Sequence, residues 1–363
     1  MSFGANAAAP GPRVAIVGSG AWGTTLALIV ARNEAVTLLS HSAETAARIA
    51  DTRRNERRLP GLDLPPRVEV SADPETLASA TDLVILAVPS AYLRSTVGRV
   101  ARAIPASADV LSVAKGLENE TLLRMTEVIA DASAGAGAAI ASERIAALSG
   151  PNLAQEIARG LPASAVIAST APALGERIVA RIARREFRLY TNPDVLGVEL
   201  CGALKNIIAI AAGAADGLGF GDNGKAGLMT RGLAEMTRLG LAAGANPLTF
   251  AGLAGIGDII ATCGSKLSRN HRLGEELARG RTWRDIEASL PGVAEGAYTV
   301  DAALALAARH GVEMPIAQEV HNALFEGKSV QRCLVDLLAR ESKDELADFQ
   351  AWANQIRETP NRG

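Results

Sequence analysis

Lys205 stands in surroundings that suit proton transfer. It lies in an apolar, helix-like segment, and the residues three and four positions away share its helix face: Cys201, Gly202, Ile208 and Ala209. Burial among such neighbours disfavours the charged ammonium group, so the proton becomes easier to remove and the side chain can act as a general acid or base. The alternative is a lysine whose ammonium group reaches water along the apolar face.

Asp258 is a candidate partner for this lysine. It ends the segment Gly255–Asp258, where apolar and glycine neighbours make an unpaired carboxylate costly, so we expect a cationic partner such as Lys205. The competing interpretation is an aspartate that only forms a local turn.

Phosphate binding is indicated at a helix start further along the chain. Ser268-Arg269-Asn270 precedes a helix-like stretch and so combines helix-start amides with a guanidinium fork, which suits a phosphate. The alternative is that Ser and Asn here only cap the helix. Glu295, which follows Val293 at another helix start, also has two interpretations. It is either a site residue or only an acid that the helix dipole stabilises in the first turn.

A glycine-rich turn predicts a dinucleotide site. After the strand-like run Val14–Val17 the chain reads Gly18-Ser19-Gly20-Ala21-Trp22-Gly23, and the helix-like Thr24–Ala31 follows. In this context the first glycine permits a tight turn, the second lets backbone approach a pyrophosphate, and the third lets the helix pack close to the strand. A merely flexible turn is the alternative. Trp22 suits either packing against the sheet or a cofactor contact.

The end of the second predicted strand bears on the coenzyme. Folds specific for NAD normally offer Asp or Glu to the ribose hydroxyls there, whereas this chain has Leu39-Ser40-His41-Ser42. A carboxylate would repel a 2′-phosphate, so its absence, with His41 and Arg48 nearby, indicates that NADPH is tolerated or preferred over NADH. Glu44 reaching the ribose is the alternative.

Three loops follow predicted strands: the glycine turn, Lys115-Gly116 and Gly150-Pro151-Asn152. In a parallel sheet they lie along its carboxyl edge, where doubly wound folds bind ligands. Lys115 therefore suits an anion or cofactor contact, the alternative being a solvated loop lysine.

The elements that position these residues form two groups. Up to about residue 191, apolar strand-like runs alternate with helix-like stretches, which predicts an α/β fold with a doubly wound, Rossmann-type parallel sheet. The expected strands are Val14–Val17, Val36–Leu39, Leu83–Val88, Val110–Ala114, Ile145–Ser149, Ala165–Ala168 and Phe187–Tyr190. Beyond residue 194, Ala- and Leu-rich segments predict an all-α C-terminal domain: Val195–Ala215, Leu228–Ala243 and Ala297–Arg309.

The chain of 363 residues is longer than one core usually supports, about 250–300 residues. We expect a disordered tail over 1–12, a dinucleotide-binding domain over 13–193, a helical substrate and catalytic domain over 194–345, and a C-terminal tail or helix over 346–363. The segment Asp131–Ser142, rich in Ala, Gly and Ser, is expected to be a flexible insertion.

Composition excludes several classes of function. A net charge of −2 disfavours non-specific binding to nucleic acid or anionic membranes. The three cysteines lack metal-ligand spacing, which predicts no metal and a reducing compartment. The sequence offers neither a signal peptide nor an uninterrupted apolar run of about 18 residues, so we expect a cytoplasmic protein without a membrane span. The oligomeric state stays open, a homodimer being one option.

Together these segments resemble the NAD(P)-dependent sn-glycerol-3-phosphate dehydrogenase family, in its bacterial biosynthetic branch. Seven motifs in order span almost the whole chain, which chance produces far less readily than one. They are Gly18–Thr24, Ala114–Gly116, Leu148–Ala154, Gly202–Asn206, Gly255–Asp258, Ser268–Asn270 and Gly292–Gly296.

The resemblance implies reversible reduction of dihydroxyacetone phosphate to sn-glycerol 3-phosphate with NADPH or NADH, supplying phospholipid synthesis, with Lys205 as the general acid and base. Asp258 and Thr262 would belong to the catalytic centre, which Asn206 supports. The implied substrate contacts are Lys115, Gly150, Asn152, Lys205, Asp258, Ser268, Arg269 and Asn270. The implied dinucleotide contacts are Gly18–Gly23, His41, Lys115, Ala154, Asn206, Arg269, Val293 and Glu295.

Two positions depart from the family pattern. Asn152 stands where Ser is common, which keeps a hydrogen-bonding side chain, and His41 stands where Arg is frequent, which leaves the coenzyme preference open. Two other functions also stay open: a related two-domain dehydrogenase acting on a β-hydroxy acid or sugar acid, and a non-catalytic redox sensor that binds the dinucleotide. The polar set around Lys205 argues against the sensor.

Overall fold

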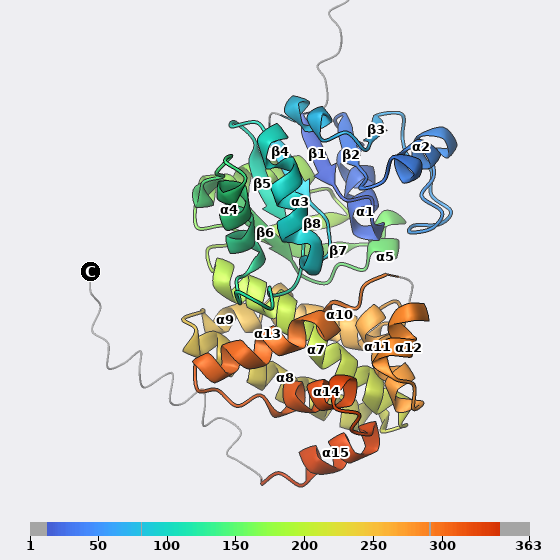
Figure 1. Cartoon of the computed structure of the whole chain (residues 1–363), viewed down its shortest axis with the longest axis vertical. Coiled ribbons are helices and arrows are strands. Elements are labelled where there is room, and N and C mark those ends of the chain that lie inside the picture. The colour runs from blue at the N-terminus through green and yellow to red at the C-terminus, as the bar shows by residue number, and fades with distance from the viewer. Residues whose placement is uncertain (1–12, 81, 290–291, 342–363) are drawn as a thin grey trace, which may run out of the picture. The chain divides into compact units, whose positions relative to one another are not determined.

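The computed structural model describes residues 13–80, 82–289 and 292–341. The chain divides into two compact units: unit 1 comprises residues 1–115 and 123–195, and unit 2 comprises residues 116–122 and 196–363 (Figure 1). The tails expected at 1–12 and 346–363 lie outside the described residues.

Unit 1 is built around an eight-stranded sheet in the order β3-β2-β1-β4-β5-β6-β7-β8 (Figure 1). The expected strands are all present, and only their ends shift, so the doubly wound α/β fold is confirmed. The strands are β1 (Val14–Val17), β2 (Val36–Leu39), β3 (Val68–Ser71), β4 (Leu83–Leu86), β5 (Asp109–Ser112), β6 (Ile145–Ser149), β7 (Ala163–Ala168) and β8 (Phe187–Asn192).

The edge strand β3 is absent from the sequence prediction. Only Val68 of its four residues is buried, and Glu69 interrupts the apolar pattern. The burial that marks a central strand is therefore missing at this edge.

The sheet is also not wholly parallel, contrary to the prediction. β7 pairs antiparallel with β6, and β8 runs parallel to β7. The connection between β6 and β7 holds only the short helix α5 (Ala154–Ala158). Five helical residues rise about 7.5 Å, far less than the roughly 20 Å of a six-residue strand, so the chain returns in the opposite direction. β1, β4, β5 and β6 remain parallel, so the three predicted loops do share one carboxyl edge.

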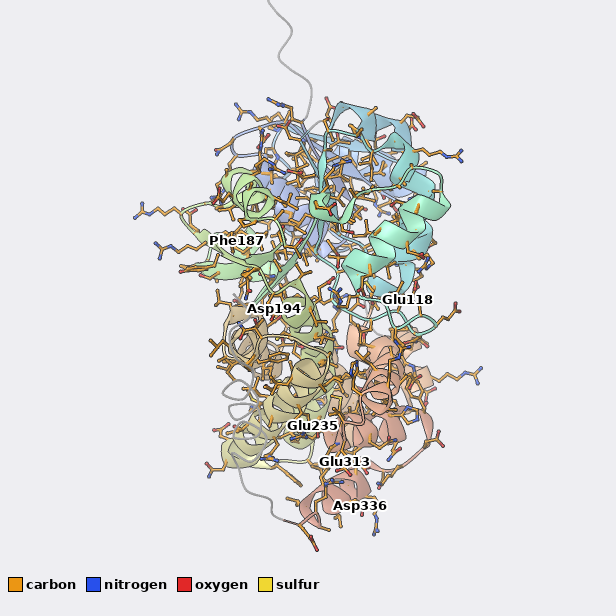
Figure 2. The ribbon with its side chains drawn as sticks, turned by 90° about the vertical axis from the view of Figure 1, so that its left-hand side faces the viewer. Glu118, Phe187, Asp194, Glu235, Glu313 and Asp336 are labelled. Atoms are coloured by element: carbon orange, nitrogen blue, oxygen red, sulfur yellow. The ribbon has the colours of Figure 1, made fainter. Side chains whose placement is uncertain are left out.

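Helices cover both faces of this sheet. Val14 and Ile16 of β1 belong to the core that Leu26 of α1 enters, whereas Val17 faces the core that contains Val97 of α3. Phe187, labelled in Figure 2, lies in the first of these cores. The helices of unit 1 are α1 (Ala21–Val30), α2 (Ala43–Thr52), α3 (Leu93–Val100), α4 (Met125–Gly135), α5 and α6 (Pro172–Ile182), with the 3-10 turns η1 (Pro74–Ser79), η2 (Ser90–Tyr92), η3 (Ala101–Ala103) and η4 (Ser142–Arg144).

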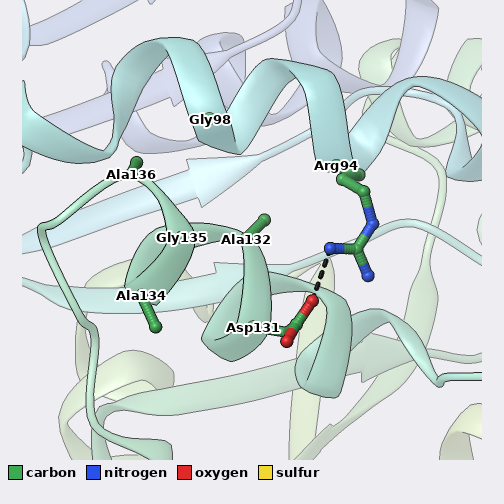
Figure 3. Close-up of a pocket in the computed structure, with 7 residues that line it drawn as sticks. All are labelled: Arg94, Gly98, Asp131, Ala132, Ala134, Gly135 and Ala136. Carbon is green, nitrogen blue, oxygen red and sulfur yellow. Dashed lines mark hydrogen bonds and ion pairs between the residues drawn. The ribbon is translucent and has the colours of Figure 1, made fainter.

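The segment 131–142 is not the flexible insertion that its composition indicates. Its first residues form the end of α4, as expected of alanine, the strongest helix former. Ser133 Oγ donates to the Ala130 carbonyl (3.0 Å) and accepts from the Ile140 amide (3.0 Å), which ties the following loop to the helix. Arg94 of α3 pairs with Asp131 beside an open hollow of about 490 Å³ (Figure 3). None of the expected site residues lines this hollow.

Unit 2 is helical throughout its described elements, which confirms the predicted all-α C-terminal domain. A side chain at Gly213 of α7 would place its Cβ 1.9 Å from the His271 carbonyl oxygen, and one at Gly274 of α11 would lie 1.9 Å from the Ile210 carbonyl oxygen. These two glycines therefore let α7 and α11 pack backbone to backbone. The elements are α7 (Val195–Gly217), α8 (Gly221–Ala242), α9 (Pro247–Phe250), the π-helical turn η5 (Leu253–Gly257), α10 (Asp258–Gly264), α11 (Arg269–Ala278), α12 (Trp283–Ser289), α13 (Glu295–Arg309), α14 (Pro315–Phe325) and α15 (Val330–Leu338).

Two stretches of unit 2 are long and apolar enough to cross a membrane by length and composition alone. Val195–Gly217 contains an 18-residue window with a mean hydropathy of 1.7. Of that window, 83% is buried inside the protein, as in the core helix of a soluble protein. Pro247–Gly264 is divided among α9, η5 and α10 and is half buried. Both are weak evidence for a membrane span.

Candidate active site

The three glycines of the predicted dinucleotide turn differ in what surrounds them. Gly18 has a φ of +115°, and a Cβ there would lie 2.4 Å from the Ala87 carbonyl oxygen. A Cβ at Gly23 would lie 1.9 Å from the Gly18 carbonyl oxygen, whereas one at Gly20 would meet nothing within 4 Å. The first glycine thus makes the turn, the third allows close packing, and the second faces open space.

The helix that follows this turn suits an anionic group. Gly20 is the N-cap of α1 and offers no side chain to the helix amides, and the first turn contains no acidic residue. The positive end of the helix dipole is therefore not neutralised by a carboxylate in that turn. The residues present fit the pyrophosphate of a dinucleotide.

The loops after β5 and β6 meet beside this turn within unit 1. Lys115 Nζ donates to the Gly150 carbonyl oxygen (2.8 Å), so the predicted lysine and glycine are in direct contact. Thr25 Oγ1 of α1 donates to the Ala154 carbonyl oxygen (3.1 Å), which places Ala154 against the dinucleotide helix. The structure therefore brings these three predicted residues to one edge of the sheet.

Asn152 stands out in the same loop. Its Oδ1 and Nδ2 atoms are both buried and have no hydrogen-bond partner among the described residues. Because buried polar atoms are nearly always paired, this amide suits contact with a polar group at the carboxyl edge of the sheet.

Trp22 and His41 occupy different surroundings. The Trp22 ring packs edge-on against Phe187, with ring centroids 6.0 Å apart, which favours the packing interpretation of this residue. His41 follows β2 and is exposed, whereas its neighbour Ser40 is buried and accepts a hydrogen bond from Ser19 Oγ (3.0 Å). A serine pair inside the protein thus precedes the position where an acid would bind a ribose, and His41 reaches solvent.

Lys205, Asp258 and Thr262 form a buried cluster in unit 2. Lys205 Nζ donates to Asp258 Oδ1 (3.0 Å) and to Thr262 Oγ1 (2.7 Å), and Thr262 Oγ1 donates to the same Asp258 oxygen (2.9 Å). The side chains of Lys205 and Asp258 are 7% and 1% exposed. The predicted pairing of Lys205 with Asp258 is therefore present. The two alternative interpretations, a lysine that extends to water and an aspartate that only forms a turn, are wrong.

The local sequence explains this cluster. Asp258 begins α10, directly after the π-helical turn η5, and Thr262 lies one helical turn later on the same face. The negative charge of Asp258 compensates the buried ammonium group of Lys205. Two of the three ammonium protons are used by the contacts within the described residues, so the group retains a donor for a further oxygen.

A chain of hydrogen bonds between amide groups starts next to Lys205. Asn206 Nδ2 donates to the Gly202 carbonyl (3.3 Å), Asn270 Nδ2 donates to Asn206 Oδ1 (2.9 Å), and the Gly296 amide donates to Asn270 Oδ1 (3.0 Å). Both asparagines are buried. The chain fixes the starts of α11 and α13 against the helix that carries the lysine.

The remaining predicted residues lie at those two helix starts. Ser268 is the N-cap of α11, where its Oγ accepts from the His271 amide (3.2 Å), and Arg269 is the first residue of the helix and is exposed. The capping interpretation of Ser268 is therefore correct, while the first-turn amides and Arg269 still suit a phosphate. Glu295 is the first residue of α13, directly after Val293-Ala294.

The sequence gives no sign of one polar residue at the dinucleotide turn. Asn55 Nδ2 donates to the Ser19 carbonyl oxygen (2.9 Å) and to Thr24 Oγ1 (2.8 Å), across 36 and 31 residues of chain. A pattern of nearby residues cannot reveal contacts at such separations.

Comparison with known proteins connects these two groups of residues to one family. Residues 13–174 match the model of the NAD-dependent glycerol-3-phosphate dehydrogenase N-terminus, and residues 194–335 match the model of its C-terminus. This chain belongs to the NAD-dependent glycerol-3-phosphate dehydrogenase family. The first match contains the glycine turn, Lys115 and Asn152, and the second contains Lys205 and Asp258.

Individual family members match nearly the whole chain. This chain is 45% identical over 335 residues to the glycerol-3-phosphate dehydrogenase (NAD(P)+) of Chlorobium limicola, and the match covers 92% of this chain and 99% of that protein. It is 44% identical to that of Streptomyces avermitilis, covering 92% and 98%. The crystal structure of glycerol-3-phosphate dehydrogenase from Coxiella burnetii matches with a TM-score of 0.84 and 35% identity, covering 91% of this chain and 99% of that one.

Proposed function

We propose that this chain reduces dihydroxyacetone phosphate to sn-glycerol 3-phosphate, reversibly, with NADH or NADPH, and so supplies glycerol phosphate for phospholipid synthesis. The observation that carries the proposal is the buried cluster of Lys205, Asp258 and Thr262, in a chain whose family holds a dinucleotide site and a glycerol phosphate activity. A redox sensor has no need of such a proton donor, so this cluster favours an enzyme.

Lys205 carries the proton in the proposed reaction. A bound NAD(P)H supplies a hydride for C2 of the substrate. Lys205 Nζ donates a proton to the oxygen on C2 as negative charge develops there, which leaves a neutral amine and an alcohol. In the reverse direction the neutral amine accepts the hydroxyl proton. Asp258 and Thr262 hold the nitrogen in place through their hydrogen bonds.

Other residues hold the substrate and the coenzyme. Arg269 and the first-turn amides of α11 bind the phosphate, so binding energy remote from C2 orients the reacting carbon. Lys115, Gly150 and Asn152 complete the proposed substrate contacts, and this role is supported by the buried amide of Asn152, which has no hydrogen-bond partner among the described residues. The proposed dinucleotide contacts are Gly18–Gly23, His41, Lys115, Ala154, Asn206, Arg269, Val293 and Glu295.

The proposal places the enzyme in the cytoplasm, where its substrate is a small soluble phosphate ester, and includes a homodimer as its assembly. Light scattering on the purified protein distinguishes the masses of a monomer and a dimer. A monomer at working concentrations would contradict the homodimer without affecting the proposed reaction.

Substrate profiling tests the proposed reaction. Purified protein with NADH or NADPH is given dihydroxyacetone phosphate, dihydroxyacetone without the phosphate, or the 2-oxo or 3-oxo form of a hydroxy acid. We expect turnover of the phosphate ester and little of the others. Better turnover of an unphosphorylated oxo acid would identify a different dehydrogenase, and coenzyme binding without any turnover would favour the sensor.

A further inference from the structure

We propose that Asn55 is a positioning residue of the dinucleotide site, where it sets the orientation of the Ser19-Gly20 peptide and of the first turn of α1. This inference rests on the dinucleotide part of the proposed function and deepens it. Asn55 lies in the segment between α2 and β3, outside the glycine motif.

The Asn55 amide spans the turn from one side to the other. One Nδ2 proton goes to the Ser19 carbonyl oxygen (2.9 Å), before the second glycine, and one goes to Thr24 Oγ1 (2.8 Å), inside α1. Asn55 and Thr24 are 3% and 2% exposed, so no solvent competes for these bonds. Both donors of a buried amide are thus devoted to the glycine turn.

The contact with Ser19 determines where the next amide points. In a trans peptide the carbonyl and the following N–H point in opposite directions. Because the Ser19 carbonyl is directed at buried Asn55, the Gly20 N–H is directed to the opposite side. A Cβ at Gly20 would meet nothing within 4 Å, so open space adjoins this residue. The geometry therefore presents a backbone donor where a phosphate oxygen is expected.

Ser19 is held from a second side by its own hydroxyl. Ser19 Oγ donates to Ser40 Oγ (3.0 Å) at the end of β2, and both residues are buried. The carbonyl and the side chain of Ser19 are therefore both fixed, which leaves the Ser19-Gly20 peptide little freedom to rotate. A ligand that binds a preorganised peptide avoids the entropy of ordering it.

The segment that carries Asn55 is itself closed into a compact loop. Arg54 and Asp63 pair across its base, and the Leu64 amide donates to the Arg53 carbonyl (2.7 Å). The Asn55 carbonyl accepts from the amide of Leu59 (2.8 Å), whose side chain is buried. Hydrogen bonds within the loop thus hold the backbone of Asn55 in place.

Coenzyme affinity measured without turnover tests this role. NADH binding is followed by the increase in its fluorescence in wild type, Asn55→Asp and Thr24→Val. Asn55→Asp keeps the shape but turns the donor into an oxygen that faces the Ser19 carbonyl, so we expect the Kd for NADH to rise about tenfold or more. Thr24→Val removes one of the two bonds, for which we expect a rise of about threefold.

Ser133→Ala is the matched control. Ser133 is a fully buried side chain of unit 1 with two hydrogen bonds, and it lies on α4, which carries none of the proposed site residues. We expect this variant to lose thermal stability while its Kd for NADH stays within about twofold of wild type. At saturating NADH, Asn55→Asp should keep its KM for dihydroxyacetone phosphate within about threefold, because the substrate contacts are not altered.

Two results would overturn the role of Asn55. One is a folded Asn55→Asp variant whose Kd for NADH lies within about twofold of that of wild type. The other is a Ser133→Ala variant that loses as much affinity for NADH as Asn55→Asp does. If Asn55→Asp does not fold, Thr24→Val decides alone, and unchanged affinity there contradicts the role. Normal NADH binding by wild type without reduction of dihydroxyacetone phosphate overturns the proposed reaction only, and leaves the Asn55 comparison intact.

Discussion

At the scale of single residues, the pair of Lys205 and Asp258 is more readily explained by chemistry than by stability. Both charges are buried in an apolar helical unit, and replacing such a pair by apolar residues of similar volume is often neutral or stabilising. The arrangement instead holds an ammonium group at a fixed point, and its contacts within the described residues use two of its three protons. A fixed proton donor is what carbonyl reduction requires.

Replacement of Lys205 is the first prediction at this scale. Lys205→Met alone removes the ammonium group that compensates the buried Asp258 charge, and breaking a buried ion pair in this way destabilises by about 3–5 kcal/mol, so the variant is combined with Asp258→Asn. We expect kcat to fall by at least about 100-fold while the Kd for NADH is unchanged. Asp258→Asn alone is the control for the charge, and circular dichroism confirms folding. Turnover by the folded double variant within about threefold of Asp258→Asn would remove Lys205 from the reaction.

The coenzyme preference is a second prediction at this scale. His41 is exposed at the end of β2, where a carboxylate would repel a 2′-phosphate and bind ribose hydroxyls. His41→Asp should therefore lower kcat/KM for NADPH relative to NADH by about tenfold. His41→Asn is the uncharged control. An unaltered ratio of the two coenzymes in His41→Asp would place His41 away from the 2′ position.

At the scale of helices, the start of α11 depends on close packing against α7. The two glycines at 213 and 274 permit the approach, and the bonds from Asn206 through Asn270 to Gly296 join three helices. A helix start held in this way presents its amides in a fixed direction, which suits recognition of a phosphate.

Arg269 supplies a prediction for this element. A charge-assisted hydrogen bond to phosphate is worth about 1.5–3 kcal/mol, so Arg269→Ala should raise KM for dihydroxyacetone phosphate by roughly 10- to 100-fold. Arg272→Ala is the matched control, because this exposed arginine lies on the same helix. Equal KM values for the Arg269 and Arg272 variants would contradict phosphate binding at this helix start.

Another helix of unit 2 predicts a pH effect on stability. Glu235 of α8, labelled in Figure 2, accepts from the Ile316 amide (2.6 Å) at the start of α14. Burial raises the pKa of Glu235 to about 7 from its ordinary 4.5, although the helix amides oppose the shift. Because this pKa is raised, the folded state favours the protonated carboxyl group of Glu235. The free energy of unfolding is therefore highest below pH 4.5 and decreases as the pH rises through about 7.

Urea unfolding between pH 5 and 8 tests this effect. The shift corresponds to a decrease of roughly 3 kcal/mol in the free energy of unfolding. Glu235→Gln should remove that decrease, so its stability relative to wild type should improve as the pH rises. A constant difference between the two proteins over this range would contradict the role of Glu235.

At the scale of the whole molecule, the sequence predicts what local spacing determines. The strand, glycine turn and helix at residues 14–31 and the helix around Lys205 depend on neighbouring residues, and the structure has them. The apolar strand pattern reveals neither the direction of β7, which the short connection after β6 determines, nor the edge strand β3, which lacks that pattern. The contacts of Asn55 join residues far apart in the chain, so no local pattern reveals them. The composition of the segment 131–142 does not distinguish a flexible segment from a helix, because small residues are common to both.

Oxidation of NADH and of NADPH, measured in parallel with dihydroxyacetone phosphate as the substrate, decides whether this protein carries out the proposed reaction. Wild type should oxidise at least one coenzyme and form sn-glycerol 3-phosphate, while the folded Lys205→Met/Asp258→Asn variant should bind the coenzyme and be at least about 100-fold slower. If wild type oxidised neither coenzyme in the presence of dihydroxyacetone phosphate, the proposed reaction would be contradicted. Equal rates for wild type and the double variant would contradict the role of Lys205.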